Sequence, residues 1–329
     1  MQQSFRSFTS VADVPDVAQL LQEAHEIKKQ PLLHAALGKH KTLGLLFFNA
    51  SLRTRISTQK AAHNLGMNVV VINVGTESWK LEFDDGAVMD GDTVEHIKEG
   101  AAVLGQYCDI LAVRAFAGLQ NREEDYSEPV LNSLMRYAGV PILSLESATR
   151  HPLQSFADLI TIQELTASKA TTTRPKVVLT WAPHPRALPQ AVPNSFAEWM
   201  RRADVDLVIT HPKGFELSEE FTHDVPILYD QDAALEGADI VYPKNWSPYA
   251  HNYGAALGSA WREYAAWTVN AQKLARTNNA KVLHCLPTRR NVEIADDVLD
   301  STASAVIQEA ANRVYAAQTV LKRMIESLS

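Results

Sequence analysis

Residues 42–74 read TLGLLFFNASLRTRISTQKAAHNLGMNVVVINV, and this stretch decides the fold that the sequence predicts. Thr42–Phe48 is a short apolar run typical of a buried strand. Ser51–Leu65 has helical character and ends at Gly66, which suits the left-handed residue after a helix. Met67–Val74 is rich in Val and Ile and indicates a second strand. The order strand, helix, strand predicts a parallel βαβ unit.

The same alternation continues along most of the chain. The capping-box pattern Asp92-Thr93-Val94-Glu95 predicts a helix from there to about Tyr107, and the polar stretch 166–175 predicts a surface loop. Further strands are expected at Asp109–Arg114, Val140–Leu145, Val177–Trp181, Val205–Thr210, Ile240–Tyr242 and Val282–His284, and further helices at Glu128–Tyr137, His151–Leu165 and Glu309–Leu328. This order predicts an α/β fold with two doubly wound parallel-sheet domains joined by helices.

Length and composition limit the class of protein. The 329 residues exceed the ~250 at which a single core stops growing, so two domains are expected, at 1–150 and 151–308. A hydrophobic fraction of 46% excludes disorder, and no apolar run reaches the ~18 residues of a membrane helix. Two cysteines and the absence of a signal-peptide pattern predict a cytoplasmic protein. A net charge of −7 argues against a nucleic-acid partner.

Common cofactor and metal motifs are missing from the sequence. No G-x-G-x-x-G or P-loop pattern occurs, and 14 glycines are few for glycine-built nucleotide loops. There is no H-E-x-x-H motif and no Cys pair at metal spacing. We therefore expect neither a metal nor a cofactor.

The stretch Ser51-Leu52-Arg53-Thr54-Arg55 is a candidate anion site. It follows a strand and opens a helix, so backbone N–H groups, hydroxyls and guanidinium groups meet at one point. Such a point suits a phosphate. The alternative is an ordinary helix start whose arginines pair with surface carboxylates, and the residues alone do not decide between the two.

Two further motifs join this candidate site. His151-Pro152-Leu153-Gln154 puts an imidazole and an amide at a helix start, where both can donate to a carbonyl oxygen. His284-Cys285-Leu286-Pro287 follows an apolar strand, at the edge where α/β sheets bind ligands. Arg114, at another strand end, adds a cation to that edge. The alternatives are a capping histidine and a buried small hydrophobe at Cys285.

Taken together, these motifs resemble the aspartate and ornithine carbamoyltransferases, which carry S-x-R-T-R, H-P-x-Q and H-C-L-P in the same order. The resemblance covers essentially the whole chain. It implies that residues 1–150 bind carbamoyl phosphate, that 151–308 bind the amine substrate, and that the helix 309–329 packs back on the first domain. It also implies a homotrimer whose active sites are shared between subunits.

Other segments resemble the branch of this family that uses N-acylated ornithine. Trp181-Ala182-Pro183-His184-Pro185-Arg186 and Trp79 match that branch, which takes this Trp from a neighbouring subunit. Where the acetyl type carries Glu and the familiar succinyl type Pro, this chain has Val94. A Glu there would repel the second carboxylate of a succinyl group, so Val favours N-succinylornithine. N-acetylornithine is the alternative; plain ornithine or aspartate, or a catalytically silent regulatory relative, fits less well.

The resemblance also implies roles for individual residues. The catalytic groups are expected to be Arg114, His151, Gln154 and Cys285. The contacts to carbamoyl phosphate are expected from Ser51, Leu52, Arg53, Thr54, Trp79, Arg114, His151, Gln154, Cys285, Leu286 and Arg313. The contacts to the acylated ornithine are expected from Glu146, His184, Lys244, Arg289, Val94 and Phe116.

Overall fold

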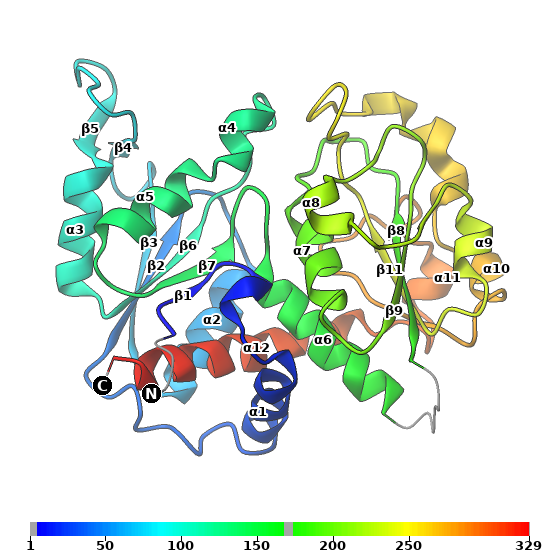
Figure 1. Ribbon diagram of the computed structural model, residues 1–329, viewed down its shortest axis with the longest axis horizontal. Helices are drawn as coiled ribbons and strands as arrows, with labels where there is room; N and C mark the ends of the chain where they lie inside the picture. The colour runs from blue at the N-terminus through cyan, green and yellow to red at the C-terminus, as the bar shows by residue number, and fades with distance from the viewer. Residues whose placement is uncertain (1–4, 168–173, 329) are drawn as a thin grey trace. The chain divides into compact units, whose positions relative to one another are not determined.

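The computed structural model describes residues 5–167 and 174–328, so most of the predicted loop at 166–175 lies outside the described residues. The chain divides into two compact units (Figure 1). The first unit comprises Met1–Gly118, Glu123–Leu153 and Arg313–Ser329, and the second comprises Leu119–Arg122 and Gln154–Asn312. The division therefore falls within helix α6 (Pro152–Thr166) and within helix α12 (Val306–Glu326).

The first unit contains a five-stranded, wholly parallel sheet. Its strands, in spatial order, are β1 (Ser7–Phe8), β7 (Ile142–Glu146), β6 (Ile110–Arg114), β2 (Thr42–Phe47) and β3 (Asn68–Asn73). Its helices are η1 (Val11–Asp13), α1 (Val17–Lys29), α2 (Arg53–Asn64), α3 (Ile97–Tyr107), α5 (Pro129–Tyr137) and the C-terminal part of α12. Helix α4 (Arg122–Tyr126) also lies here from Glu123 onward.

Both faces of this first sheet are buried. Leu46, Leu111 and Val113 form one core with residues of α3 and α5. On β2 the side chains that point the other way, Leu43 and Leu45, are also fully buried. Helices α1, α2 and α12 lie together, away from α3 and α5, and are joined by hydrogen bonds (Figure 1). The continuous apolar strands are what a parallel sheet covered on both faces requires.

The predicted helix start at 92–95 is wrong. Residues Thr93–His96 form strand β5, which pairs in parallel with β4 (Lys80–Glu82). Helix α3 begins only at Ile97, and the His96 side chain caps it by accepting from the Lys98 backbone N–H. The capping-box pattern fails here because the backbone hydrogen bonds of this stretch are made to strand β4 and not within a helix.

The second unit contains another five-stranded parallel sheet. Its strands, in spatial order, are β10 (Ile227–Leu228), β9 (Asp206–Thr210), β8 (Lys176–Trp181), β11 (Ile240–Lys244) and β12 (Lys281–Val282). Its helices, besides α6 and the start of α12, are α7 (Ala191–Met200), α8 (Glu219–Thr222), α9 (Gln231–Leu235), η2 (Gly258–Trp267), α10 (Ala271–Leu274) and α11 (Asp296–Leu299). Three tryptophans, Trp181, Trp199 and Trp246, are fully buried in it.

Strand order reverses between β2 and β6 in the first unit and between β8 and β11 in the second. Ligands of doubly wound sheets bind at such points, beyond the carboxyl ends of the strands. Arg114 is the last residue of β6, next to Phe47 at the end of β2. Lys244 is the last residue of β11, next to Trp181 at the end of β8. The predicted fold of two doubly wound parallel sheets is confirmed.

Candidate functional site

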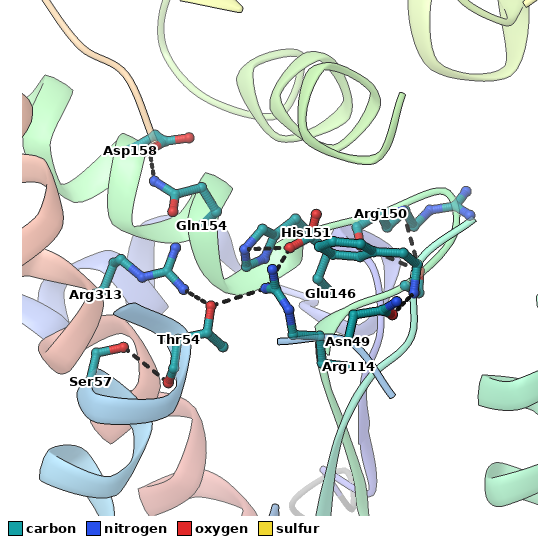
Figure 2. Close-up of polar contacts among 12 residues, drawn as sticks. Asn49, Thr54, Ser57, Arg114, Glu146, Arg150, His151, Gln154, Asp158 and Arg313 are labelled. Atoms are coloured by element: carbon teal, nitrogen blue, oxygen red, sulfur yellow. Dashed lines mark hydrogen bonds and ion pairs between the residues drawn. The ribbon is translucent and has the colours of Figure 1, made fainter. Parts of the chain in front are cut away.

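A polar cluster at the carboxyl edge of the first sheet centres on the Thr54 hydroxyl (Figure 2). Its Oγ1 accepts a hydrogen bond from Arg114 at 3.2 Å and another from Arg313 at 2.5 Å. A hydroxyl has two acceptor lone pairs and one proton. Because both lone pairs receive guanidinium N–H groups, the Thr54 hydroxyl can serve a ligand only as a donor.

Arg114 is held in this cluster by a buried ion pair. Its Nη1 lies 2.7 Å from Glu146 Oε2, and its guanidinium stacks 4.3 Å from the centre of the Phe116 ring. Glu146 ends β7 and lies opposite Arg114 after a shift of register by one residue, so the sheet itself brings the two together. His151 Nε2 lies 3.4 Å from the same carboxylate oxygen. Three predicted site residues on separate elements thus meet at one edge (Figure 2).

Burial keeps the His151 imidazole neutral. The pKa of His151 lies well below its ordinary value because the ring is desolvated and the Arg313 and Arg114 guanidinium groups repel a further positive charge. In the described part of the chain, His151 Nδ1 and Arg114 Nε are buried without a hydrogen-bond partner. Buried polar atoms nearly always have a hydrogen-bond partner. Two such atoms without one, next to the guanidinium groups of Arg114 and Arg313, therefore indicate a site for a polar, anionic ligand.

The helix start beside this cluster carries residues of the predicted anion site. Helix α2 begins at Arg53, two residues later than the sequence predicts, and its N-cap is Leu52. The Leu52 side chain makes no capping hydrogen bond to the first turn of this helix. Ser51 and Arg53 are partly exposed, and the Leu52 side chain is largely exposed.

Among the described residues, neither Trp79 nor Val94 forms a hydrogen bond or ion pair with the residues of this cluster. Val94 is on β5 and is 65% exposed, and Trp79 precedes β4 and is 55% exposed. The indole N–H of Trp79 donates to Glu95 at 2.7 Å, which fixes the ring against the β4–β5 sheet. The structure thus leaves two large apolar side chains on the surface of the first unit.

Gln154, in the first turn of α6, is oriented by two buried carboxylates of the second unit. Its Nε2 donates to Asp158 at 2.7 Å and to Glu309 at 2.9 Å (Figure 2 shows the first of these). Glu309 also accepts from the His284 backbone N–H at 2.6 Å. One carboxylate therefore joins the H-P-x-Q and H-C-L-P motifs.

The H-C-L-P segment is held by the His284 ring. Its Nδ1 accepts from the Leu286 backbone N–H at 2.9 Å, and its Nε2 faces Glu293. Burial raises the pKa of Glu293, but the hydrogen bond from His284, the charge of Lys244 and the Arg289 backbone N–H outweigh it and lower that pKa to about 2. Cys285 stands between His284 and Leu286; it is partly buried and forms no disulfide. The ring thereby fixes the backbone around Cys285.

His184, Arg289 and Lys244 form a cationic group in the second unit. Arg289 Nε donates to His184 Nε2 at 2.9 Å, and His184 Nδ1 lies 3.0 Å from both the carbonyl oxygen and the backbone nitrogen of Arg186. Burial lowers the pKa of His184 and keeps it neutral, as this arrangement needs. The buried Lys244 ammonium donates to the Asn245 carbonyl at 3.2 Å. This group suits a carboxylate ligand.

Three acidic residues that organise these sites were missed in the sequence. Glu293 and Glu309 hold His284, and Glu128 binds the segment that precedes His151. No motif marks these three residues, because each lies 9 to 25 residues along the chain from the residue that it binds. The two come into contact only when the chain is folded. In the described residues no group of His, Cys, Asp and Glu is arranged to hold a metal ion, and no helix is long and apolar enough to cross a membrane.

The buried histidines predict acid sensitivity of the fold. Burial lowers the pKa of His151 and of His211, so both stay neutral in the folded state where the unfolded chain binds protons. The free energy of unfolding should therefore fall as the pH drops from 7.5 to 5.5, by up to about 1.4 kcal/mol per pH unit for each group. Urea unfolding across this range measures the slope. His211→Gln should reduce it, and a flat profile in the wild type would contradict this expectation.

Comparison with known proteins matches both parts of the chain. Residues 6–164 match the "Aspartate/ornithine carbamoyltransferase, carbamoyl-P binding domain", and residues 189–324 match the "Asp/Orn binding domain" of the same family. An N-succinylornithine carbamoyltransferase from Bacteroides thetaiotaomicron is 55% identical over 98% of this chain and 99% of the relative. An N-acetylornithine carbamoyltransferase from Xanthomonas campestris is 36% identical over 87% of this chain and 88% of its own.

Solved structures are similar along the same length. Acetylornithine transcarbamylase complexed with acetylcitrulline has a TM-score of 0.91 at 34% identity, covering 97% of this chain and 98% of that one. A Glu-to-Val mutant of N-acetyl-L-ornithine transcarbamylase, complexed with carbamyl phosphate and N-succinyl-L-norvaline, has a TM-score of 0.90 at 34% identity, covering 97% and 99%. Both halves and nearly the full length agree, and the chain belongs to the aspartate/ornithine carbamoyltransferase family.

Proposed function

We propose that this enzyme transfers the carbamoyl group of carbamoyl phosphate to the δ-amine of N-succinyl-L-ornithine. The products are N-succinyl-L-citrulline and phosphate, in a step of arginine biosynthesis. The observation that carries the reaction type is the buried cluster of Thr54, Arg114 and His151, which offers donors to an oxygen-rich anion. The two relatives at 53% and 55% identity, both N-succinylornithine carbamoyltransferases, support the substrate.

The first unit binds carbamoyl phosphate in this proposal. Its phosphate is held at the start of α2 by Ser51, Leu52, Arg53 and Thr54, with Trp79 and Arg313 as further contacts. Gln154, Cys285 and Leu286 bind the carbamoyl group, with Gln154 accepting from its NH₂. This role fits the two hydrogen bonds that already occupy the Gln154 NH₂ group, because they turn donors away from the ligand.

Catalysis rests on stabilising the negative charge that grows on the carbamoyl oxygen. Arg114, the Thr54 hydroxyl and His151 donate to that oxygen as the tetrahedral intermediate forms. The δ-amine must attack in its neutral form, although a free alkylammonium has a pKa of about 10. Surrounding cations and burial lower that value, and the departing phosphate accepts the proton. The bond between the carbamoyl carbon and the phosphate oxygen then breaks, phosphate leaves, and the new bond between the carbamoyl carbon and the δ-nitrogen remains.

The second unit binds the acylated ornithine. His184, Lys244 and Arg289 supply the cationic group for its carboxylates. Glu146 and Phe116 are proposed as further substrate contacts, and Val94 leaves room for the succinyl arm. The Glu-to-Val mutant of the acetyl enzyme, complexed with N-succinyl-L-norvaline, supports this role for a Val.

A direct assay tests the substrate. Purified enzyme with carbamoyl phosphate is offered N-succinylornithine, N-acetylornithine and ornithine separately, and each ureido product is quantified. We expect the highest kcat/KM with N-succinylornithine. A higher value with N-acetylornithine would contradict the proposal and favour the second candidate, which the 36% identical relatives and the acetyl-enzyme structures support.

We also propose a homotrimer in the cytoplasm, in which Trp79 reaches the carbamoyl-phosphate site of a neighbouring subunit. Exposed apolar side chains on the first unit, including Ile56, Val70 and Trp79, support a subunit contact. Light scattering should give three times the mass of the chain.

A further inference from the structure

Glu128 occupies a backbone conformation that does not suit it. Its φ of 51° and ψ of 50° lie in the left-handed region, and Pro129 follows at the first position of α5. The left-handed region is unfavourable for a non-glycine residue, and a residue before proline prefers extended backbone. Glycine would fit better here. A glutamate kept at such a position points to a role for its side chain.

The Glu128 carboxylate binds four donors of one buried segment, residues 147–150. It accepts from Ser147 Oγ at 2.6 Å, from the Ala148 backbone N–H at 3.1 Å and from the Thr149 backbone N–H at 2.8 Å, and the Thr149 hydroxyl also donates to it. Ser147 and Thr149 are almost fully buried. A buried N–H left without an acceptor destabilises the folded state, so the conformation of this segment depends on Glu128.

This segment is the link between two groups of the carbamoyl-phosphate cluster. Glu146 immediately precedes it and pairs with Arg114, and His151 immediately follows it. The two ends meet at 3.4 Å between His151 Nε2 and Glu146 Oε2 (Figure 2). A change in the segment therefore moves the imidazole relative to the ion pair.

We propose that Glu128 is a positioning residue for carbamoyl transfer, whose carboxylate fixes segment 147–150 and thereby places His151 and Glu146. The proposal rests on the proposed function, because it assigns the segment a purpose in that reaction. Glu128 acts through the backbone of its neighbours and needs no contact with a substrate.

Glu128→Gln is the sharpest test, since it keeps the size of the side chain but turns an NH₂ group toward backbone donors. We expect kcat to fall by at least about 10-fold, because a displacement near 1 Å can cost 10²-fold. The acid limb of the pH profile of kcat/KM should also move to higher pH, since a loosened segment admits water to His151. A merely structural residue would change thermal stability and leave that profile unmoved.

Two variants complete the design. Glu128→Asp keeps the charge but shortens the reach, so its kcat should lie between those of the wild type and Glu128→Gln. Glu99→Gln, on the exposed side of α3, is the matched control and should behave as the wild type. The Asp variant also serves if the Gln variant does not fold.

The outcomes separate the two proposals. A wild type without carbamoyl transfer to any of the three amines overturns the proposed function, and the role of Glu128 with it. An active wild type, together with folded Glu128 variants whose kcat and pH profile stay within about twofold, overturns the positioning role alone.

Discussion

Replacing Arg114 by methionine is expected to lower kcat for carbamoyl transfer by about 10²- to 10³-fold. Its guanidinium is one of two buried in the cluster and binds the Thr54 hydroxyl and Glu146. Methionine keeps much of the side chain's length and apolar contact but removes every donor. Steady-state kinetics with saturating carbamoyl phosphate and N-succinylornithine measures the loss.

The same replacement removes the ion-pair partner of the buried Glu146 carboxylate, so stability should fall too, by about 3–5 kcal/mol. A double variant separates the two effects. Combining Arg114→Met with Glu146→Gln neutralises the carboxylate and should restore most of the free energy of unfolding, measured in urea. It should not restore kcat. Recovery of activity together with stability would show that Arg114 only supports the fold.

Replacing Val94 by glutamate is expected to lower the preference for N-succinylornithine over N-acetylornithine by about 10- to 100-fold in the ratio of kcat/KM values. The added carboxylate repels the second carboxylate of the succinyl group, while the neutral acetyl group is unaffected. Two like charges 4 Å apart repel by about 4 kcal/mol near a protein surface. Val94 is 65% exposed, so solvent screening makes the effect smaller than that.

Val94→Gln is the matched control for this experiment, because glutamine has the shape of glutamate without its charge. It should keep the succinyl preference within about threefold. An equal loss in both variants would mean that size rather than charge sets the preference. An unchanged ratio in Val94→Glu would mean that the succinyl arm does not pass this residue.

The parallel sheets and their order of elements followed from local patterns in the sequence. Alternating apolar runs and helices such as those of residues 42–74 need only near neighbours to be recognised. Strands β1 and β10, of two residues each, do not stand in a longer apolar run and are not predicted. The sequence predicts a helix start at strand β5. The prediction fails because strand β5 forms its backbone hydrogen bonds with β4, and the local sequence carries no sign of that pairing.

The site was predicted as a set of residues but not as a set of contacts. The sequence predicts Arg114 and Cys285 at one edge, and this is wrong: Arg114 ends β6 in the first sheet, where it lies 3.2 Å from Thr54, whereas Cys285 follows β12 in the second sheet. The roles of these residues in binding and catalysis stay predictions. Glu128 could not be predicted in this way. No local sequence pattern indicates its left-handed backbone or its hydrogen bonds to a segment about 20 residues away.

The arrangement around Thr54 has a consequence for inhibitor chemistry. With both lone pairs of its hydroxyl taken by guanidinium groups, the cluster presents only donors at that point. A compound that places an amide or ammonium N–H there would leave buried donors facing one another and be rejected. An effective inhibitor of this enzyme should instead present an oxygen acceptor to the hydroxyl, whatever the remainder of the molecule contains.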